Sequence, residues 1–231
     1  MGRVSNSAKY LYQLFSKGFL GDVMVKIMIV FDTRYGNTMR LAEAVAEGAN
    51  SYPGTDAFLR RVEVIEPEVI IQKNERWRDA NAEFAKIQEA KPEDLYEVDA
   101  LILGSPTRYG VMTAPMKKFI DSTGKVWLSS GIAGKVGAAF TSTSTPHGGQ
   151  EMTILSLMIP MLHHGMILVT PGYLDPVMFV AGSPYGPTSV SGGASDQPPT
   201  ENDLKVARFL GRRVAEVASQ LKFARERMGN K

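Results

Sequence analysis

The sequence predicts a three-layer α/β fold in which helices cover both faces of a five-stranded parallel sheet. Two observations support this fold class. Short apolar runs of strand length alternate along the chain with helical patterns, and three of these runs end in polar loops that carry glycine and hydroxyl side chains. Strands that alternate with helices favour parallel pairing through right-handed crossovers, and the expected strand order is 2-1-3-4-5.

The composition allows one substantial core within a single domain. The chain has 231 residues, 44% of them hydrophobic and 22% charged, and no shift in composition divides it. We assign residues 26–223 to this domain, residues 1–25 to an N-terminal extension and residues 224–231 to a C-terminal tail. The extension has a short amphipathic pattern without a small-residue cleavage site, which favours an accessory helix over a targeting signal.

The first half of the chain begins with a clear strand–loop–helix unit. An apolar strand over residues 25–31 runs into the polar loop 32–37, and a helical pattern follows. A second strand is expected at residues 58–64. Residues 66–90 are polar and irregular, with a helix expected near residues 79–89.

The middle of the chain repeats the strand–helix alternation twice. Residues 99–104 form a near-continuous apolar run, which is typical of a strand covered on both faces, and a helix is expected at 114–123. A fourth strand at 136–140 is followed by a helix at 151–163. Each of these strands ends in a polar loop.

The last part of the chain contains an unusually long connection. A fifth strand is expected at residues 166–170 and an amphipathic helix at 201–223. Residues 171–199 between them are rich in Gly, Pro and Ser. Because routine connections are much shorter, this segment is expected to be functional or to lie at an interface.

Polar loops follow the first, third and fourth predicted strands, and parallel sheets bind ligands at these carboxyl ends. The first loop opens a helix, whose unpaired amides and dipole favour a phosphate group. The alternative role of the same side chains is to cap the helix. The candidate phosphate-binding residues are Thr33, Arg34, Tyr35, Gly36, Asn37 and Thr38.

The other two loops supply groups suited to an aromatic ring system. The third strand is followed by backbone amides and a flat aromatic side chain, and the fourth by hydroxyls that can bond a polar ring edge. Ordinary turn chemistry is the alternative for each loop alone, whereas the three loops together fit a flavin nucleotide. The candidate ring-binding residues are Pro106, Thr107, Arg108, Tyr109, Ser142, Thr143, Ser144, Thr145, His147 and Gly148.

Several classes of function are excluded by what the chain lacks. It has no cysteine, so redox chemistry requires a bound organic cofactor. Its 26 basic and 24 acidic residues are dispersed, and we expect no nucleic-acid partner. Neither a Gly-x-x-x-x-Gly-Lys motif nor a Gly-x-Gly-x-x-Gly motif follows the first strand. We expect no metal site, because His163 and His164 are adjacent and lack a third ligand, and no membrane span, because no apolar run approaches roughly 20 residues.

Several stretches carry a resemblance to a known family: residues 33–38 with 44–49, 104–110, 119–124 with Trp127, 142–151, 163–165, and 183–188 with 191–193. In order and combination they resemble the WrbA family, the type IV NAD(P)H:quinone oxidoreductases of the flavodoxin-like superfamily, from about residue 26 to 221. The insertion at 183–193 separates this family from simple flavodoxins. The resemblance implies a flavodoxin-like fold, FMN as cofactor, NADH or NADPH as co-substrate, a quinone as acceptor, and a cytoplasmic homotetramer.

The resemblance also implies the roles of particular residues. It implies that residues 33–38 hold the FMN phosphate, that residues 106–109 flank the ring, and that residues 142–148 together with His163 contact its pyrimidine side. It further implies that Tyr35 and Trp127 form part of the pocket where nicotinamide and quinone stack in turn, with a neighbouring subunit contributing.

Two features depart from the family pattern, and two catalytic candidates have plainer alternatives. His147 stands in a loop that is mostly Gly and Thr in the family, and Asp32 adds an acid beside the phosphate turn. The catalytic candidates are His163 and Trp127. Without the family, His163 would be a histidine that bonds the carbonyls at a helix end, and Trp127 would be a core residue.

The expected mechanism is ping-pong hydride transfer through FMN, with the protein orienting the reactants. The alternative is a flavodoxin-like carrier that binds FMN and passes single electrons without turning over nicotinamide. A receiver-type regulatory domain that uses Asp32 is disfavoured, because no lysine ends the fifth strand. The sequence leaves open the choice between NADH and NADPH and the identity of the quinone.

Overall fold

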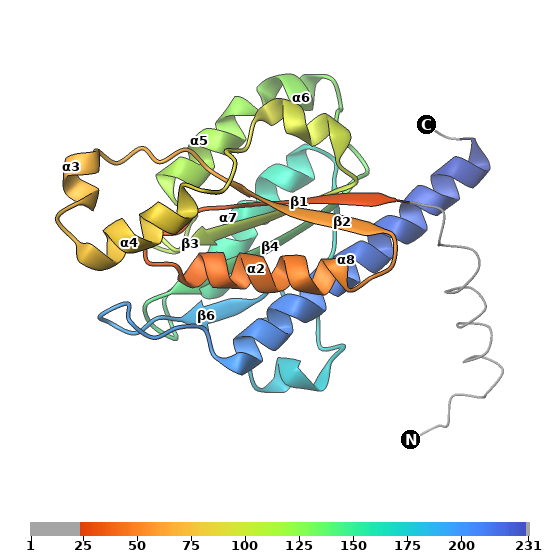
Figure 1. The fold of residues 1–231 in the computed structure, drawn as a ribbon. Coiled ribbons are helices and arrows are strands. Elements are labelled where there is room, and N and C mark those ends of the chain that lie inside the picture. Colours follow the sequence, from red (N-terminus) through yellow and green to blue (C-terminus); the bar gives the residue numbers. More distant parts are fainter. Residues whose placement is uncertain (1–23, 230–231) are drawn as a thin grey trace.

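The computed structural model of the chain describes residues 24–229. The predicted N-terminal extension therefore lies almost wholly outside the described residues. Within them, helices flank a twisted sheet on both sides, and the strand arrows of Figure 1 point toward the edge at which α4 and the loop after β6 lie. The predicted three-layer α/β fold is confirmed.

The sheet is parallel throughout and has the predicted order β2-β1-β3-β4-β5. A further strand, β6, pairs with the end of β4. The apolar side chains of β1, β3 and β4 are buried in one hydrophobic core. The strands are β1 (Val25–Phe31), β2 (Thr55–Arg61), β3 (Ala100–Pro106), β4 (Val136–Thr143), β5 (Ile167–Leu168) and β6 (Thr188–Val190).

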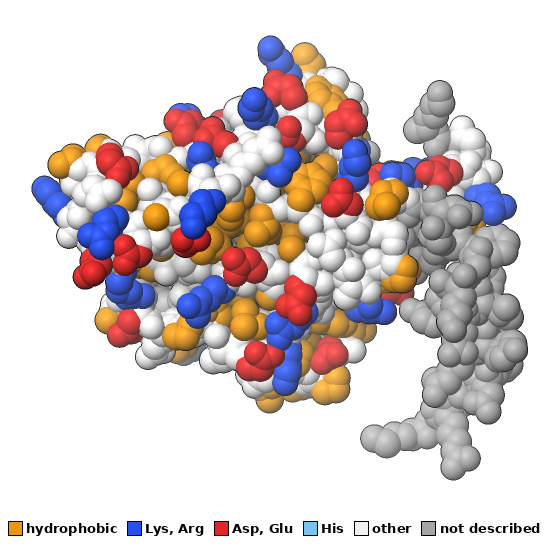
Figure 2. All heavy atoms as spheres, viewed as in Figure 1, with side chains coloured by type: hydrophobic (Ala, Val, Ile, Leu, Met, Phe, Trp, Pro, Cys, Tyr) orange, Lys and Arg blue, Asp and Glu red, His pale blue; other side chains and the backbone are white. Residues whose placement is uncertain are grey.

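Two long helices, α2 and α8, lie side by side on one face of the sheet (Figure 1). Their backbones approach so closely that a Cβ atom on Gly211 would stand 2.0 Å from the carbonyl oxygen of Val45. Figure 2 shows acidic and basic side chains interspersed over this face. The helices are α2 (Asn37–Asn50), α3 (Glu68–Ile71), α4 (Glu75–Phe84), η1 (Pro92–Glu97), α5 (Ala114–Ser122), α6 (Gly124–Leu128), α7 (Gln150–His163), η2 (Pro176–Phe179) and α8 (Glu201–Met228).

Several boundaries differ from the sequence prediction. β2 begins three residues earlier than predicted, because pairing with β1 fixes its register from Val25 with Thr55 to Phe31 with Arg61. α4 likewise begins earlier, where the Asn74 side chain accepts a hydrogen bond from the Trp77 amide and caps the helix. α8 continues to Met228, five residues beyond its predicted end.

The largest differences lie around the carboxyl end of β4. This strand continues to Thr143, three residues past its predicted end, because Thr141 and Ser142 pair with both β3 and β6 and Thr143 pairs with β6. β5 has only two residues, and the chain leaves the sheet before Pro171, which has no amide proton for a ladder. The long connection that follows β5 returns to the sheet as β6, which the sequence pattern did not reveal.

Candidate functional site

An open pocket of about 280 Å³ lies at the carboxyl ends of β1, β3 and β4. Its position is the switch point of the sheet, because the chain continues from β1 to β2 on one side and then returns to β3 on the other. All three predicted loops contribute to it. Its lining residues are Thr33, Arg34, Tyr35, Asn37, Thr38, Pro106, Thr107, Arg108, Ser142, Thr143, Ser144, Ser191 and Ser195.

The first loop forms a cradle at the amino end of α2. Gly36 stands at the N-cap with a φ of 91°, a left-handed conformation that glycine adopts without strain. The Gly36 amide donates to the Thr33 hydroxyl at 3.1 Å, which closes the turn. Since no described side chain caps α2, the amides of its first turn stay available to a ligand, and the helix dipole favours an anion there.

Arg34 places an unpartnered cation at the same end of the pocket. Its guanidinium carbon lies 3.9 Å from the ring centre of Trp77, which holds the side chain in place. The Nε atom is buried and has no hydrogen-bond partner among the described residues. A buried donor without a partner fits the phosphate of a nucleotide, which would supply the missing acceptor.

The second loop turns sharply and exposes an aromatic ring. Arg108 and Val111 exchange two backbone hydrogen bonds across Tyr109 and Gly110. Both turn residues have positive φ, 52° for Tyr109 and 83° for Gly110, and an aromatic residue adopts this conformation at a cost. Tyr109 is fully exposed and does not line the pocket itself, although its neighbours Pro106, Thr107 and Arg108 do.

The third loop contributes only its first part to the pocket. Ser142, Thr143 and Ser144 line it, whereas the predicted residues Thr145, His147 and Gly148 are not among its lining residues. Because β4 extends to Thr143, the rest of the loop folds back, with the Thr143 hydroxyl donating to the Thr145 carbonyl at 2.8 Å. His147 is exposed at the tip of this loop.

Two pocket residues, Ser191 and Ser195, come from the long connection and were not predicted individually. β6 brings Ser191 to β4, where its amide donates to the Thr143 carbonyl at 2.8 Å. The Arg76 guanidinium of α4 holds the next segment by donating to the carbonyls of Ala194, at 2.9 Å, and Ser195. The sequence signals were the length of the connection and, for Ser191, its place in the family-like stretch 183–193, whereas nothing indicated Arg76.

Asp32 lies directly before the phosphate cradle, with its carboxyl turned inward. Burial raises the pKa of this carboxyl above its ordinary value, although the hydrogen bond from the Thr113 hydroxyl, 2.6 Å long, opposes the shift. The nearby charge of Glu66 raises the pKa further. The Thr113 bond ties the end of β1 to the start of α5.

The two catalytic candidates lie together but outside this pocket in a single chain. The Trp127 indole donates to the His163 carbonyl at 3.1 Å. His163 ends α7, whose 14 residues begin beside the pocket and carry the chain about 20 Å toward the opposite edge of the sheet. His163 and the Trp127 ring are both exposed. Burial lowers the pKa of the adjacent His164, and the charge of His163 lowers it further.

Neither a metal cluster nor a membrane-spanning helix is found in the part of the chain that the structure describes. No three His, Asp or Glu side chains within residues 24–229 are placed to hold a metal ion. Among the same residues, no helix is both long and apolar enough to cross a bilayer.

Comparison with known proteins agrees with this arrangement. Residues 27–175 match the family model described as NADPH-dependent FMN reductase. A protein of Aromatoleum aromaticum named NAD(P)H dehydrogenase (quinone) is 44% identical over 202 residues, which cover 85% of this chain and 97% of that protein. The chain belongs to the WrbA-type NAD(P)H dehydrogenase (quinone) family. A second member with that name, from Archaeoglobus fulgidus, is 46% identical over 200 residues, covering 86% of this chain and all of the relative.

Solved structures place this WrbA-type chain in the same fold. The crystal structure of a flavodoxin, WrbA-like protein from Agrobacterium tumefaciens covers 85% of the chain and 98% of its own length, with 29% identity and a TM-score of 0.60. A flavodoxin from the domain Archaea covers 84% of the chain at 25% identity with a TM-score of 0.53. The predicted family and flavodoxin-like fold are therefore confirmed.

Proposed function

We propose that this WrbA-type chain reduces quinones with electrons from NADH or NADPH by means of FMN held in the carboxyl-edge pocket. The observation that carries the proposal is the cradle at the amino end of α2, where the amides of the first turn have no side-chain cap. Arg34, whose buried Nε has no partner among the described residues, lines the same pocket together with several hydroxyls. Bound FMN supplies the two-electron redox chemistry that links a nicotinamide to a quinone. The names of the relatives support both co-substrates.

We assign the pocket residues to two ends of the flavin nucleotide. The residues from Thr33 to Thr38 bind the phosphate through amides, hydroxyls and the Arg34 guanidinium. The residues from Pro106 to Tyr109 flank the ring, and the segment from Ser142 to Gly148 bonds its polar edge, chiefly through Ser142, Thr143 and Ser144. Tyr109, which is fully exposed next to these residues, would exclude water from one side of the reacting molecules.

We propose that the chain forms a homotetramer and that a neighbouring subunit supplies His163 and Trp127 to each pocket. The support is α7, which is apolar on all sides although one side faces solvent in a single chain. Met152, Ile159 and Leu162 on that side are each more than half exposed. A helix that is hydrophobic all round is normally buried, so a second copy is its natural cover.

Two measurements test the proposal. Titration of the apoprotein with FMN, followed by flavin fluorescence, should show saturable binding with one FMN per chain. Steady-state rates at several NADH and quinone concentrations should give parallel double-reciprocal lines, because the two co-substrates are expected to use one pocket in turn. Converging lines would contradict the alternating mechanism, and FMN binding without quinone turnover would favour the electron-carrier alternative.

Light scattering tests the assembly, and a mass of four chains is expected. A purely monomeric protein that still turns over quinone would contradict the role of the neighbouring subunit.

A cytoplasmic location is part of the proposal, because NADH and NADPH are intracellular metabolites. Cell fractionation should recover the protein with the soluble intracellular proteins, and recovery outside the cell would contradict this location.

A further inference from the structure

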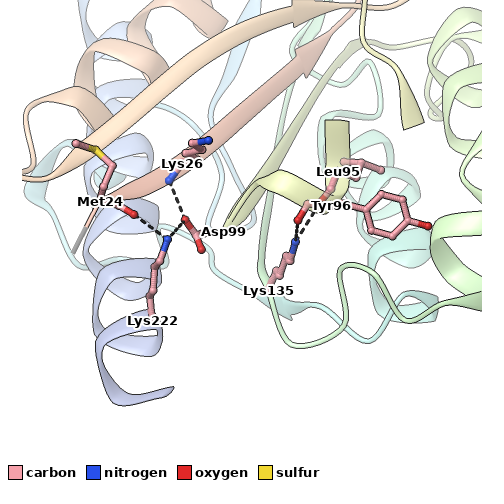
Figure 3. Close-up of polar contacts among 7 residues, drawn as sticks. All are labelled: Met24, Lys26, Leu95, Tyr96, Asp99, Lys135 and Lys222. Atoms are coloured by element: carbon pink, nitrogen blue, oxygen red, sulfur yellow. Dashed lines mark hydrogen bonds and ion pairs between the residues drawn. The ribbon is translucent and has the colours of Figure 1, made fainter. Parts of the chain in front are cut away.

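A second pocket, of about 180 Å³, lies at the amino edge of the sheet, at the opposite end of β4 from the flavin pocket. It is bounded by the starts of β1, β3 and β4 and by the last turns of α8. Figure 3 shows Lys135 and Lys222 reaching toward the backbone there from two different elements. Three cations line this amino-edge pocket: Lys135, Lys222 and Arg225.

The ammonium of Lys135 is partly buried without a counter-charge. It donates to the carbonyls of Leu95 at 3.0 Å and Tyr96 at 2.9 Å, and no carboxylate of residues 24–229 lies within 4 Å of it. Burial lowers the pKa of Lys135, and the charges of Asp99 and Glu97 only partly oppose the shift. Buried charges in proteins are normally paired, and the residues from 24 to 229 supply no such partner to this ammonium.

The Arg225 guanidinium is also partly buried without a counter-charge among the described residues. Its guanidinium donates to the Gly134 carbonyl at 2.6 Å and has no carboxylate within 4 Å among the described residues. Lys222, in contrast, is paired with Asp99 at 2.9 Å and also donates to the Met24 carbonyl. The Asp99 carboxylate also accepts a hydrogen bond from the Lys26 backbone amide.

The three cations that line the pocket keep N–H donors that no described contact uses. Each lysine has three N–H donors and gives two of them to the contacts above, and Arg225 has five and gives one to Gly134. The pocket is lined by three cations against two acids, Asp99 and Glu226. We propose that the amino-edge pocket binds a tetrahedral oxyanion, either free phosphate or the phosphate group of a small monoester, through Lys135 and Arg225.

This proposal does not depend on the proposed enzymatic function. The two pockets lie at opposite ends of the eight-residue strand β4, which spans about 25 Å. An anion in the amino-edge pocket would join the start of β4 to the end of α8, and the expected result is stabilisation of the folded chain rather than a change in catalysis.

Calorimetric titration of the FMN-loaded protein with sulfate, at constant ionic strength, tests the site. Loading with FMN is essential, because the α2 cradle would otherwise bind the same probe. Saturable binding of one sulfate per chain is expected, with affinity reduced at least about tenfold in Lys135→Met and in Arg225→Met. Lys205→Met removes an exposed lysine from the same long helix and should leave the affinity unchanged.

Two further comparisons sharpen the test. Titration with phosphate and then with glycerol 1-phosphate distinguishes a free anion from a monoester. Sulfate does not titrate near neutrality, so its affinity should fall as pH rises through the lowered pKa of Lys135, the group that faces the charges of Asp99, Glu97, Lys222 and Arg225. Absence of saturable binding in the wild type, or equal affinities in Lys135→Met and Lys205→Met, would overturn the proposal.

Discussion

The pockets at the two edges of the sheet are lined by different kinds of side chain. At the carboxyl edge, α2 begins, and its amides and dipole favour an anion, so the pocket is lined mainly by neutral polar side chains, with the two arginines Arg34 and Arg108. At the amino edge, α8 ends, and the negative end of its dipole is offset by Lys222 and Arg225. The comparison teaches that the direction of the adjoining helix decides whether an anion site needs neutral donors or several cations.

The largest effect is expected at the start of α2. A Cβ atom at Gly36 meets nothing within 4 Å, so Gly36→Ala should act only through its positive φ. The strain of about 1–2 kcal/mol should lower the free energy of unfolding or distort the cradle, and FMN affinity should fall about tenfold. Chemical denaturation and FMN titration measure these changes. Gly124→Ala, also in open space but without positive φ, is the matched control, and equal effects in both variants would contradict the account.

The next effect concerns the unpartnered cation in the same pocket. Arg34→Met keeps an apolar side chain against Trp77 but removes the guanidinium from the phosphate cradle. FMN affinity should fall about tenfold, because one charge-assisted hydrogen bond to the phosphate is lost. Sulfate binding at the amino-edge pocket should not change. Arg40→Met, on the exposed side of α2, serves as the control for loss of charge alone. Unchanged FMN affinity in Arg34→Met would remove Arg34 from the proposed site.

A smaller effect is expected for Trp127, which belongs to neither pocket within one chain. Trp127→Ala should leave FMN affinity unchanged and lower quinone turnover about three- to tenfold. This loss corresponds to the free energy of one aromatic contact. Light scattering on the same variant shows whether the assembly persists. Leu174→Ala removes a similarly exposed apolar side chain away from α7 and is the matched control. Equal turnover in Trp127→Ala and the wild type would exclude the indole from the reaction.

The smallest effects should be two opposite pH slopes in the free energy of unfolding of the apoprotein, one from Asp32 beside the phosphate cradle and one from Lys135 in the amino-edge pocket. Asp32 has a raised pKa when folded, so the free energy of unfolding should fall as pH rises from 3.8 through that raised pKa. Lys135 has a lowered pKa when folded, so the free energy of unfolding should rise with pH between that pKa and 10.5. Asp32→Asn should remove the first slope and Lys135→Met the second. Denaturant unfolding across pH measures both, and slopes of the same sign would refute the assignment.

Much of the fold follows from the sequence because its central strands are buried on both faces. β1 and β3 appear as continuous apolar runs, and their predicted boundaries differ little from the observed ones. β2 is an edge strand whose residues are mostly half-buried, so its pattern is weak and its register depends on pairing with β1. β6 has three residues and exists only through its pairing with β4, which no local pattern reveals.

The candidate site was predictable to a similar degree. The loops after β1, β3 and β4 were found because their Gly, Thr and Ser residues directly follow apolar strands. Ser191 and Ser195 were missed individually, since only the distant pairing of β6 with β4 and the clamp from Arg76 bring them to the pocket. The same long-range dependence leaves the roles of His163 and Trp127 as predictions, because those roles require a second chain.

The most direct test of the central claim is anaerobic stopped-flow absorbance of the FMN-loaded protein. It is mixed first with NADH or NADPH and then with benzoquinone. The account predicts rapid bleaching of the flavin band by at least one nicotinamide and its rapid return with the quinone, both at rates at least equal to steady-state turnover. Bound FMN that neither nicotinamide bleaches on this timescale would contradict the account and identify an electron carrier instead.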